Sequence, residues 1–398
     1  MSAFAPLKRC ARVQYGLGQP PVLSDNGVPI IRATNINRGR ILASDLIRAE
    51  IDDLPLDRAP LLQLGEVLVV RSGAYTGDSA RITEDWVGAA PGYDLRVTPS
   101  QALDSRFLAY TLLGQHAIDQ IDIAKSRAAQ PHLNAEDLGN LDVLRLPIAG
   151  QRAIADYLDC ETARIDALLA AKRQLLAALH GRWTSLIHHR TVGSLRSTPQ
   201  VQLRRIAALQ AGAAFPHVEQ GDSDGTIPYV KVGDLSNVDE HDELLGAANR
   251  VTATVAAMLR SPVLPAGTIV LPKIGAALLT NRRAVLAEPS CLDQNVMGVT
   301  VTVGSPRFVY YCLAATDLGL LSTPGPVPLL NEDAARALHV PWPADEVQQQ
   351  VAAELDAYRL AMRAPVAHLT KQLELLAERR QALITAAVAG NLPIPIAV

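Results

Sequence analysis

The sequence lacks most of the features on which secreted, membrane and metal-binding proteins depend. Its four cysteines lie far apart, with no CxxC pair and no neighbouring group of histidines. This spacing argues against a disulfide framework and a zinc site, and it indicates a reducing compartment. No apolar run approaches the roughly 20 residues that cross a bilayer, so we expect no membrane contact. No apolar stretch follows a basic start, so we expect no secretory signal and a cytoplasmic protein.

Motifs that carry catalysis are also missing. The sequence has no GxxxxGK[ST] loop for nucleotide phosphates and no HExxH for a catalytic zinc. It has no [DNS]PP[YFW] motif that would hold a flipped base, and no glycine-rich loop after its first strand for a methyl donor. We therefore expect a chain that is not an enzyme by itself and binds no cofactor or metal.

Positive charge is scarce as well, and this bears on nucleic-acid binding. The net charge is −3, whereas a DNA-binding domain is usually basic. Only residues 148–198 are net basic, with seven Lys and Arg against four Asp and Glu. Any DNA-binding surface must therefore come from local clusters of basic and amide side chains.

What the sequence does contain is an internal duplication. Placing residue 151 over residue 348, an offset of 197, aligns about 60 residues without a gap. Leu133-Asn134 meets Leu330-Asn331, Gln151 meets Gln348, and Gly193 meets Gly390. Earlier segments match at drifting offsets: VPIIRATNI with IPYVKVGDL at 199, and LGEVLVVRSGA with AGTIVLPKIGA at 202. The chain is therefore a variable module followed by a constant segment, both present twice.

The constant segments have the pattern of long helices. Apolar residues recur at helical spacing over 151–190 and again over 348–388, among good helix formers. About 40 residues make a rod of roughly 60 Å. Pro365 should kink the second helix or begin a new one. The apolar face of each helix needs a partner to cover it. We favour antiparallel pairing of the two helices as a coiled coil over packing of each helix on its own module only.

The variable modules are predicted to be mixed α/β. Short apolar runs such as VPIIRAT, EVLVVRS, IPYVKVG and GTIVLPKIG are bounded by turn residues, and a helix is expected over 105–121. The predicted organisation is a module over 1–147, a helical spacer over 148–198, a second module over 199–344 and a second spacer over 345–398.

These segments together resemble the specificity subunits of type I restriction-modification systems. In the first half the resemblance lies in IIRATNI with Gly39, LGEVLVVRSGAYTG, AQPHLNAEDLGNLDVLRLPIAGQRAIADYLD and RWTSLIHHRTVG. In the second half it lies in YVKVGDL, AGTIVLPKIGA, VPLLNEDAARALHVPWP and ERRQALITAAVAGNL, in the same order. In this family, each module is a target-recognition domain that reads DNA.

Candidate DNA-contacting residues of the first module lie in three segments, each of which is alternatively an ordinary polar turn. The first follows a predicted strand and is rich in arginine, which reads guanine, and asparagine, which reads adenine, in the major groove. The second is the glycine-rich turn 71–77, whose backbone allows close approach to phosphate. The third precedes Leu133-Asn134. The candidates are Arg32, Thr34, Asn35, Asn37, Arg38 and Arg40, then Arg71, Ser72, Tyr75 and Thr76, then Lys125, Arg127 and Gln130.

The second module offers fewer candidates. Lys231 and Lys273 occupy the positions of Arg32 and Arg71, but the turn at Lys273 lacks the hydroxyls. The remaining candidates are Asn281, Arg282, Arg283, Gln294 and Asn295. Because STPGPVPLLN is nearly uncharged where the first module is polar, we expect the modules to read two different half-sites.

The resemblance also implies partners. It implies a non-catalytic subunit of a DNA methyltransferase and type I site-specific deoxyribonuclease complex that reads a bipartite, asymmetric target in double-stranded DNA. Two modification (methyltransferase) subunits would dock on the helices and use S-adenosylmethionine, and restriction (translocase) subunits would use ATP and Mg²⁺. The alternative is a coiled-coil scaffold that binds no DNA.

Overall fold

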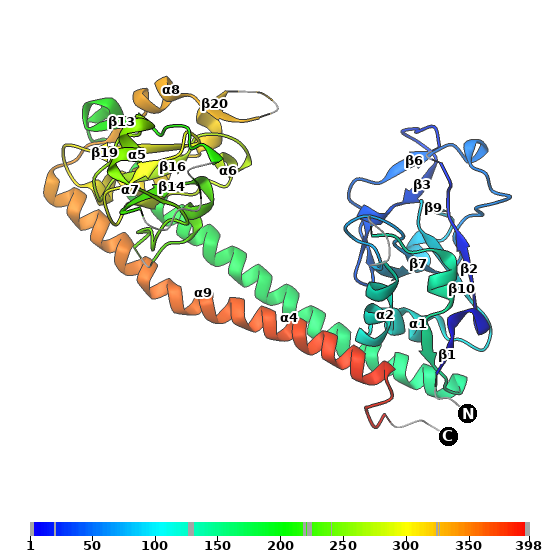
Figure 1. The fold of residues 1–398 in the computed structure, drawn as a ribbon. Helices are drawn as coiled ribbons and strands as arrows, with labels where there is room; N and C mark the ends of the chain where they lie inside the picture. The colour runs from blue at the N-terminus through cyan, green and yellow to red at the C-terminus, as the bar shows by residue number, and fades with distance from the viewer. Residues whose placement is uncertain are drawn as a thin grey trace. The chain divides into compact units, whose positions relative to one another are not determined.

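The chain forms two compact units (Figure 1). The structure, a computed structural model, describes residues 4–19, 21–125, 131–217, 220, 225–239, 241–323, 325 and 327–394. The first unit comprises Met1–Arg173 with Lys371–Val398, and the second comprises Gln174–Thr370. Each unit therefore combines one α/β module with a part of both long helices. The boundaries predicted at residues 147, 198 and 344 stay a prediction.

The first unit is built on a four-stranded antiparallel sheet in the order β2-β10-β7-β8. Its strands are β2 (Ala11–Tyr15), β7 (Val67–Val69), β8 (Ser79–Arg81) and β10 (Leu95–Pro99). The central strand β7 is buried on both faces. Val67 and Val69 lie in the core with helix α1 (Ser105–Leu113), whereas Leu68 lies in a separate core. This double burial explains why the run VLVV (67–70) is apolar throughout rather than alternating.

Smaller sheets and helices complete the first unit. A three-stranded sheet has the order β6-β3-β9, in which β3 is antiparallel to β6 and parallel to β9. The remaining elements are β1 (Phe4–Pro6), β3 (Val28–Ile31), β4 (Ile36–Asn37), β5 (Arg40–Ile41), β6 (Ile47–Ala49), β9 (Ala90–Pro91), α2 (Gln115–Lys125), α3 (Ala135–Gly139) and β11 (Asp142–Leu144). Strand β1 pairs with β11.

The helix predicted over 105–121 is two helices, α1 and α2, which meet at Gly114. A Cβ atom at Gly114 would lie 2.6 Å from Cγ2 of Val388 in the last turn of the second long helix. The close approach of that helix therefore requires glycine at the junction. Asp104 caps α1 by accepting the backbone N–H groups of Arg106 and Phe107.

The second unit repeats this topology, in agreement with the duplication in the sequence. Its main sheet has the order β13-β19-β16-β17, and its second sheet has the order β15-β14-β18 with β14 and β18 parallel. Strand β12 pairs with β22 as β1 does with β11. The strands are β12 (Gln200–Gln202), β13 (Ala207–Ala211), β14 (Ile227–Val230), β15 (Arg250–Val251), β16 (Ile269–Pro272), β17 (Ala284–Val285), β18 (Cys291–Leu292), β19 (Val296–Val301), β20 (Ser322–Thr323), β21 (Leu329–Leu330) and β22 (His339–Pro341). The short helices are α5 (Ala253–Met258), α6 (Ala276–Leu279), α7 (Pro306–Ala314) and α8 (Glu332–Ala337).

The two long helices are α4 (Ile148–His188) and α9 (Asp345–Val388), and their antiparallel pairing is confirmed within each unit. In the first unit, Lys172 hydrogen-bonds Gln372 and Arg380 pairs with Asp166, so positions that rise along α4 meet positions that fall along α9. In the second unit, the Trp183 ring stacks on Tyr358 with the ring centroids 5.9 Å apart, and Arg190, just beyond the end of α4, pairs with Glu354. The direction is therefore antiparallel there as well. Helix α9 continues through Pro365, so no new helix begins there. The predicted mixed α/β class with paired long helices is therefore confirmed.

Among the helices that the structure describes, none combines the length and the apolar character needed to cross a membrane.

Candidate nucleic-acid interface

The strand order of the first unit brings two tyrosines and an arginine to one end of the main sheet. Because β2, β10 and β7 are antiparallel neighbours, the last residue of β2 lies beside the first residue of β10 and the last residue of β7. Tyr15 ends β2, Tyr93 shortly precedes β10, and Arg71 shortly follows β7. Three residues that are far apart in the sequence therefore meet above the same sheet end.

Arg71 lies between the two aromatic rings. Its guanidinium carbon is 4.5 Å from the ring centroid of Tyr15 and 4.5 Å from that of Tyr93. Nε of Arg71 donates to Nε2 of His132 at 3.4 Å, and Ser72 forms a β-bridge with His132. The two tyrosines remain 45% and 49% exposed, so both rings face solvent as well as the arginine. We call Tyr15, Arg71, Tyr93 and His132 the Tyr–Arg cluster.

The Tyr–Arg cluster is held from below. The Tyr15 hydroxyl accepts the backbone N–H of Ala135 at the start of α3, and the carbonyl of Arg71 accepts the N–H of Leu133. Oδ1 of Asp94 accepts the N–H of Arg71 at 3.1 Å, and Oδ2 has no partner. Burial raises the pKa of Asp94 to about 6, although Arg71 opposes the rise. The cluster thus presents a fixed cation between two aromatic faces, which suits phosphate and base recognition.

The structure corrects the prediction that the Asn35 side chain reads a base. Its side chain is fully buried: Oδ1 accepts the N–H of Arg32 at 3.1 Å, and Nδ2 donates to the carbonyls of Leu42 and Ser44. Asp234, its counterpart in the second unit, accepts the N–H of Lys231 in the same way. A side-chain acceptor is therefore needed to close this turn in both halves. No polar atom of Asn35 is left for a base.

The other candidates of that segment differ in accessibility. Thr34, Asn37 and Arg38 are exposed. Arg32 donates to the carbonyl of Asp45 at 2.7 Å, and its Nε is buried without a partner. Arg40 pairs with Asp166 of α4 at 2.6 Å, so its charge is partly neutralised.

The glycine-rich turn also contains one correction. Gly73 and Gly77 have φ values of 87° and 97°, which explains the choice of glycine. The Thr76 hydroxyl is buried and donates to the carbonyl of Gly73 at 2.7 Å, so it closes the turn and does not face a phosphate. Ser72 is half-buried and Tyr75 is exposed.

The third predicted segment is only partly described. Lys125 pairs with Asp122 at 2.6 Å at the end of α2. Arg127 and Gln130 lie outside the described residues.

Among the described residues of the second unit, no arginine or lysine at the corresponding end of the main sheet lies between two tyrosine rings as Arg71 does. Lys273 follows β16 as Arg71 follows β7, and its carbonyl accepts the N–H of Leu330. Nζ of Lys273, however, pairs with Glu332 at 2.6 Å, and Ala211 stands at the end of β13 in the place of Tyr15. Lys231 lies 5.1 Å from the centroid of the Phe215 ring, and its Nζ donates to Gln220.

The predicted basic segment of the second module is mostly structural. The buried Arg283 donates to the carbonyls of Asn281 and Thr316, and burial lowers its pKa to about 10. Oδ1 of Asn281 accepts the N–H of Leu318. The structure therefore corrects the predicted DNA contact of Asn281 and Arg283, because both side chains hydrogen-bond within the unit. Asn295 donates to Asp293, whereas Arg282 and Gln294 are exposed.

In the described part of the chain, no three His, Cys, Asp or Glu side chains form a group that could hold a metal ion.

The chain was compared with family models, curated proteins and solved structures. No family model and no curated protein sequence matches the chain. One solved chain matches with a TM-score of 0.69 at 14% identity, over 98% of both chains. Its description reads "Structural basis underlying complex assembly and conformational transition of the type I R-M system". The HsdS subunit from Thermoanaerobacter tengcongensis matches with a TM-score of 0.48 at 14% identity, over 98% of this chain and 97% of its own. The type I S subunit from M. genitalium matches with a TM-score of 0.42 at 14% identity, over 97% of this chain and 95% of its own. Through the first of these matches, the chain shares its overall fold with a chain of a type I restriction-modification system.

Proposed function

We propose that the chain is the DNA specificity subunit of a type I restriction-modification complex and reads a bipartite target in double-stranded DNA. The observation that carries the proposal is the Tyr–Arg cluster, an arginine held between two half-exposed tyrosines at the end of the first sheet. The likeness of fold to a chain of a type I R-M system supports the same role.

The Tyr–Arg cluster suits DNA for a physical reason. A free arginine loses conformational freedom when it binds, whereas Arg71 is already fixed by two ring contacts and by His132. Its guanidinium can donate to a phosphate or to the acceptors of guanine. Ser72, Tyr75, Thr34, Asn37 and Arg38 supply further exposed or half-exposed groups in the same unit.

The two units are proposed to read different half-sites. Arg71 lacks a carboxylate within ion-pair distance among the described residues, whereas Lys273 is paired with Glu332. In the second unit, the exposed candidates are Gln294 and Arg282. An amide and an exposed arginine make a different pattern of donors from an arginine held between two rings, so an asymmetric target follows.

The chemistry is proposed to belong to partner subunits. Two modification (methyltransferase) subunits that use S-adenosylmethionine would bind the helices, and restriction subunits would supply ATP- and Mg²⁺-dependent DNA translocation and cleavage. Half-exposed leucines on the helices support docking there: Leu168 and Leu375 in the first unit, and Leu175 and Leu360 in the second. The competing function is a coiled-coil scaffold that does not bind DNA.

The test is DNA binding by the full chain, alone and with a modification subunit, measured by fluorescence anisotropy at several salt concentrations. Arg71→Ala should weaken binding by about 1–3 kcal/mol and lower the slope of log K against log salt by about 0.9. Arg58→Ala, which removes an arginine that is 87% exposed, is the matched control and should change neither. Absence of salt-dependent, sequence-selective binding by the wild type would favour the scaffold.

A further inference from the structure

In each unit, the same three side chains tie the module to its long helix. In the first unit they are Arg106 and Tyr110 of α1 and Asp159 of α4. In the second they are Arg307 and Tyr311 of α7 and Asp356 of α9. We call each set a helix latch.

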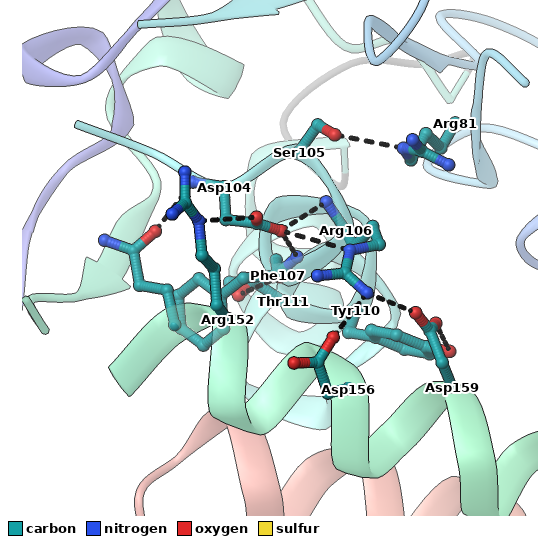
Figure 2. Close-up of polar contacts among 11 residues, drawn as sticks. Arg81, Asp104, Ser105, Arg106, Phe107, Tyr110, Thr111, Arg152, Asp156 and Asp159 are labelled. Carbon is teal, nitrogen blue, oxygen red and sulfur yellow. Dashed lines mark hydrogen bonds and ion pairs between the residues drawn. The ribbon is translucent and has the colours of Figure 1, made fainter. Parts of the chain in front are cut away.

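Figure 2 shows the helix latch of the first unit. Nη1 of Arg106 donates to Oδ2 of Asp159 at 2.8 Å and to Oδ1 of Asp156 at 2.7 Å. The Tyr110 hydroxyl donates to Oδ1 of Asp159 at 2.7 Å. One carboxylate of α4 therefore receives donors from two positions of α1 that are one helical turn apart, which fixes the rotation of α1 about its own axis.

The helix latch of the second unit has the same arrangement. Nε of Arg307 donates to Oδ1 of Asp356 at 2.7 Å, and the Tyr311 hydroxyl donates to the same oxygen. Ala353 stands in the place of Asp156, so the second latch uses a single carboxylate. Arg307 also donates to the backbone carbonyl of His241 at 2.6 Å. The contacts that the two units share are therefore Arg and Tyr to one Asp.

A buried glutamine provides a second fixed point in each unit. Oε1 of Gln151 accepts the N–H of Asp104, the cap of α1, at 2.8 Å, and Oε1 of Gln348 accepts the N–H of Ser305, the cap of α7, at 3.0 Å. Both glutamines are almost fully buried. The start of each module helix and one of its faces are thus held by the same long helix.

In the first unit these contacts continue to the Tyr–Arg cluster. Helix α1 packs against β7 and β8. Ser105, the first residue of α1, accepts a hydrogen bond from Nε of Arg81 in β8 at 3.0 Å (Figure 2). Strands β7 and β8 carry between them the turn that contains Arg71. The orientation of α1 on α4 therefore determines how the Arg71 turn is presented relative to the helix.

We infer that the helix latch is a positioning site, which orients each recognition surface on its long helix and so sets the gap between half-sites that the chain accepts. This inference rests on the proposed function. Arg106 and Asp159 are 30% and 44% exposed, and an ion pair of that exposure contributes little to stability. Its larger effect is on orientation, because hydrogen bonds from a rigid guanidinium fork are directional.

The first arm of the test measures orientation without DNA. Spin labels are placed on the full chain by Ala74→Cys in the Arg71 turn and Ala167→Cys on α4, both exposed, after Cys10 and Cys160 are replaced by serine. The distance distribution should be narrow in this parent. It should broaden or shift by on the order of 2 Å in the Asp159→Asn/Tyr110→Phe variant, which keeps side-chain volume. Arg164→Ala, which removes another arginine contact on α4 to Glu161, is the control and should change nothing.

The second arm measures DNA probes whose gap differs by one base pair from the preferred one. The wild type should lose about 10-fold or more in affinity, because one base pair rotates and displaces a half-site. The latch variant should lose clearly less, with unchanged affinity for a single half-site. An unchanged distance distribution in the variant overturns the latch inference even if DNA binds. If the distribution broadens in the variant but the wild-type chain binds no DNA sequence-selectively, the latch is upheld as an orienting contact and the proposed function is overturned instead.

Discussion

Asp94→Asn should stabilise the first unit near neutral pH. Asp94 is 2% exposed, and burial raises its pKa to about 6, from about 4 in an unfolded chain. The folded chain therefore holds this proton more tightly than the unfolded chain does. Between about pH 4 and pH 6, stability must fall as the pH rises, because the ionised carboxylate is buried.

The size of the effect follows from that difference. A pKa of about 6 in the folded chain instead of about 4 corresponds to about 3 kcal/mol lost by pH 7. Asparagine has no such loss, and its amide oxygen can still accept the N–H of Arg71. Its amide N–H₂ would occupy the place of Oδ2, which has no partner, and this costs about 1–2 kcal/mol. The net gain at pH 7 should be about 1–2 kcal/mol.

The assay is native-state hydrogen exchange of the amides in β7 and β10 between pH 4.5 and 7.5. The free energy of opening should fall with pH in the wild type and remain flatter in the variant. Asp57→Asn, at a carboxylate that is 78% exposed, is the matched control and should follow the wild type. Parallel pH profiles for the wild type and Asp94→Asn would refute the assignment of a raised pKa to Asp94.

Three other substitutions test separate parts of the account. Asn35→Ala should lower the free energy of unfolding by about 2–4 kcal/mol, because it leaves buried backbone groups unpaired; urea denaturation measures this, and unchanged stability would contradict the structural role. Glu66 and Arg96 form a buried ion pair at 2.7 Å in the first unit. Glu66→Ala should lower the free energy of unfolding by about 3–5 kcal/mol, because it leaves Arg96 buried without its carboxylate; an unaffected thermal melt would be evidence against the pair. Glu332→Gln should free Lys273 and raise the salt slope of DNA binding by about 0.9; an unaltered slope would show that Lys273 does not face DNA.

The long helices could be predicted from the sequence because their signal is local and periodic. The expected ranges 151–190 and 348–388 differ by at most three residues at either end from α4 and α9. Burial of Ile154, Leu158 and Ile165 accounts for the apolar stripe. Of the two outcomes that Pro365 predicts, a new helix does not occur, because α9 continues through this residue.

The Tyr–Arg cluster could not be predicted in the same way. The sequence predicts Arg71 in the site, but Tyr15 and Tyr93 join it only through the order of β2, β10 and β7, which no local pattern specifies. For Asn35, a usable signal was present. The duplication places it over Asp234, and the property that asparagine and aspartate share is a side-chain oxygen that accepts a backbone N–H. A turn-closing role explains both residues, whereas adenine reading explains only one.

The central claim is that the chain reads two different DNA half-sites. The most direct measurement is selection from a random duplex library by the full chain together with a modification subunit, followed by sequencing. The account predicts two unlike short sequences separated by a gap of fixed length and free composition. Recovery of one continuous palindrome, or of no enriched sequence, would contradict it.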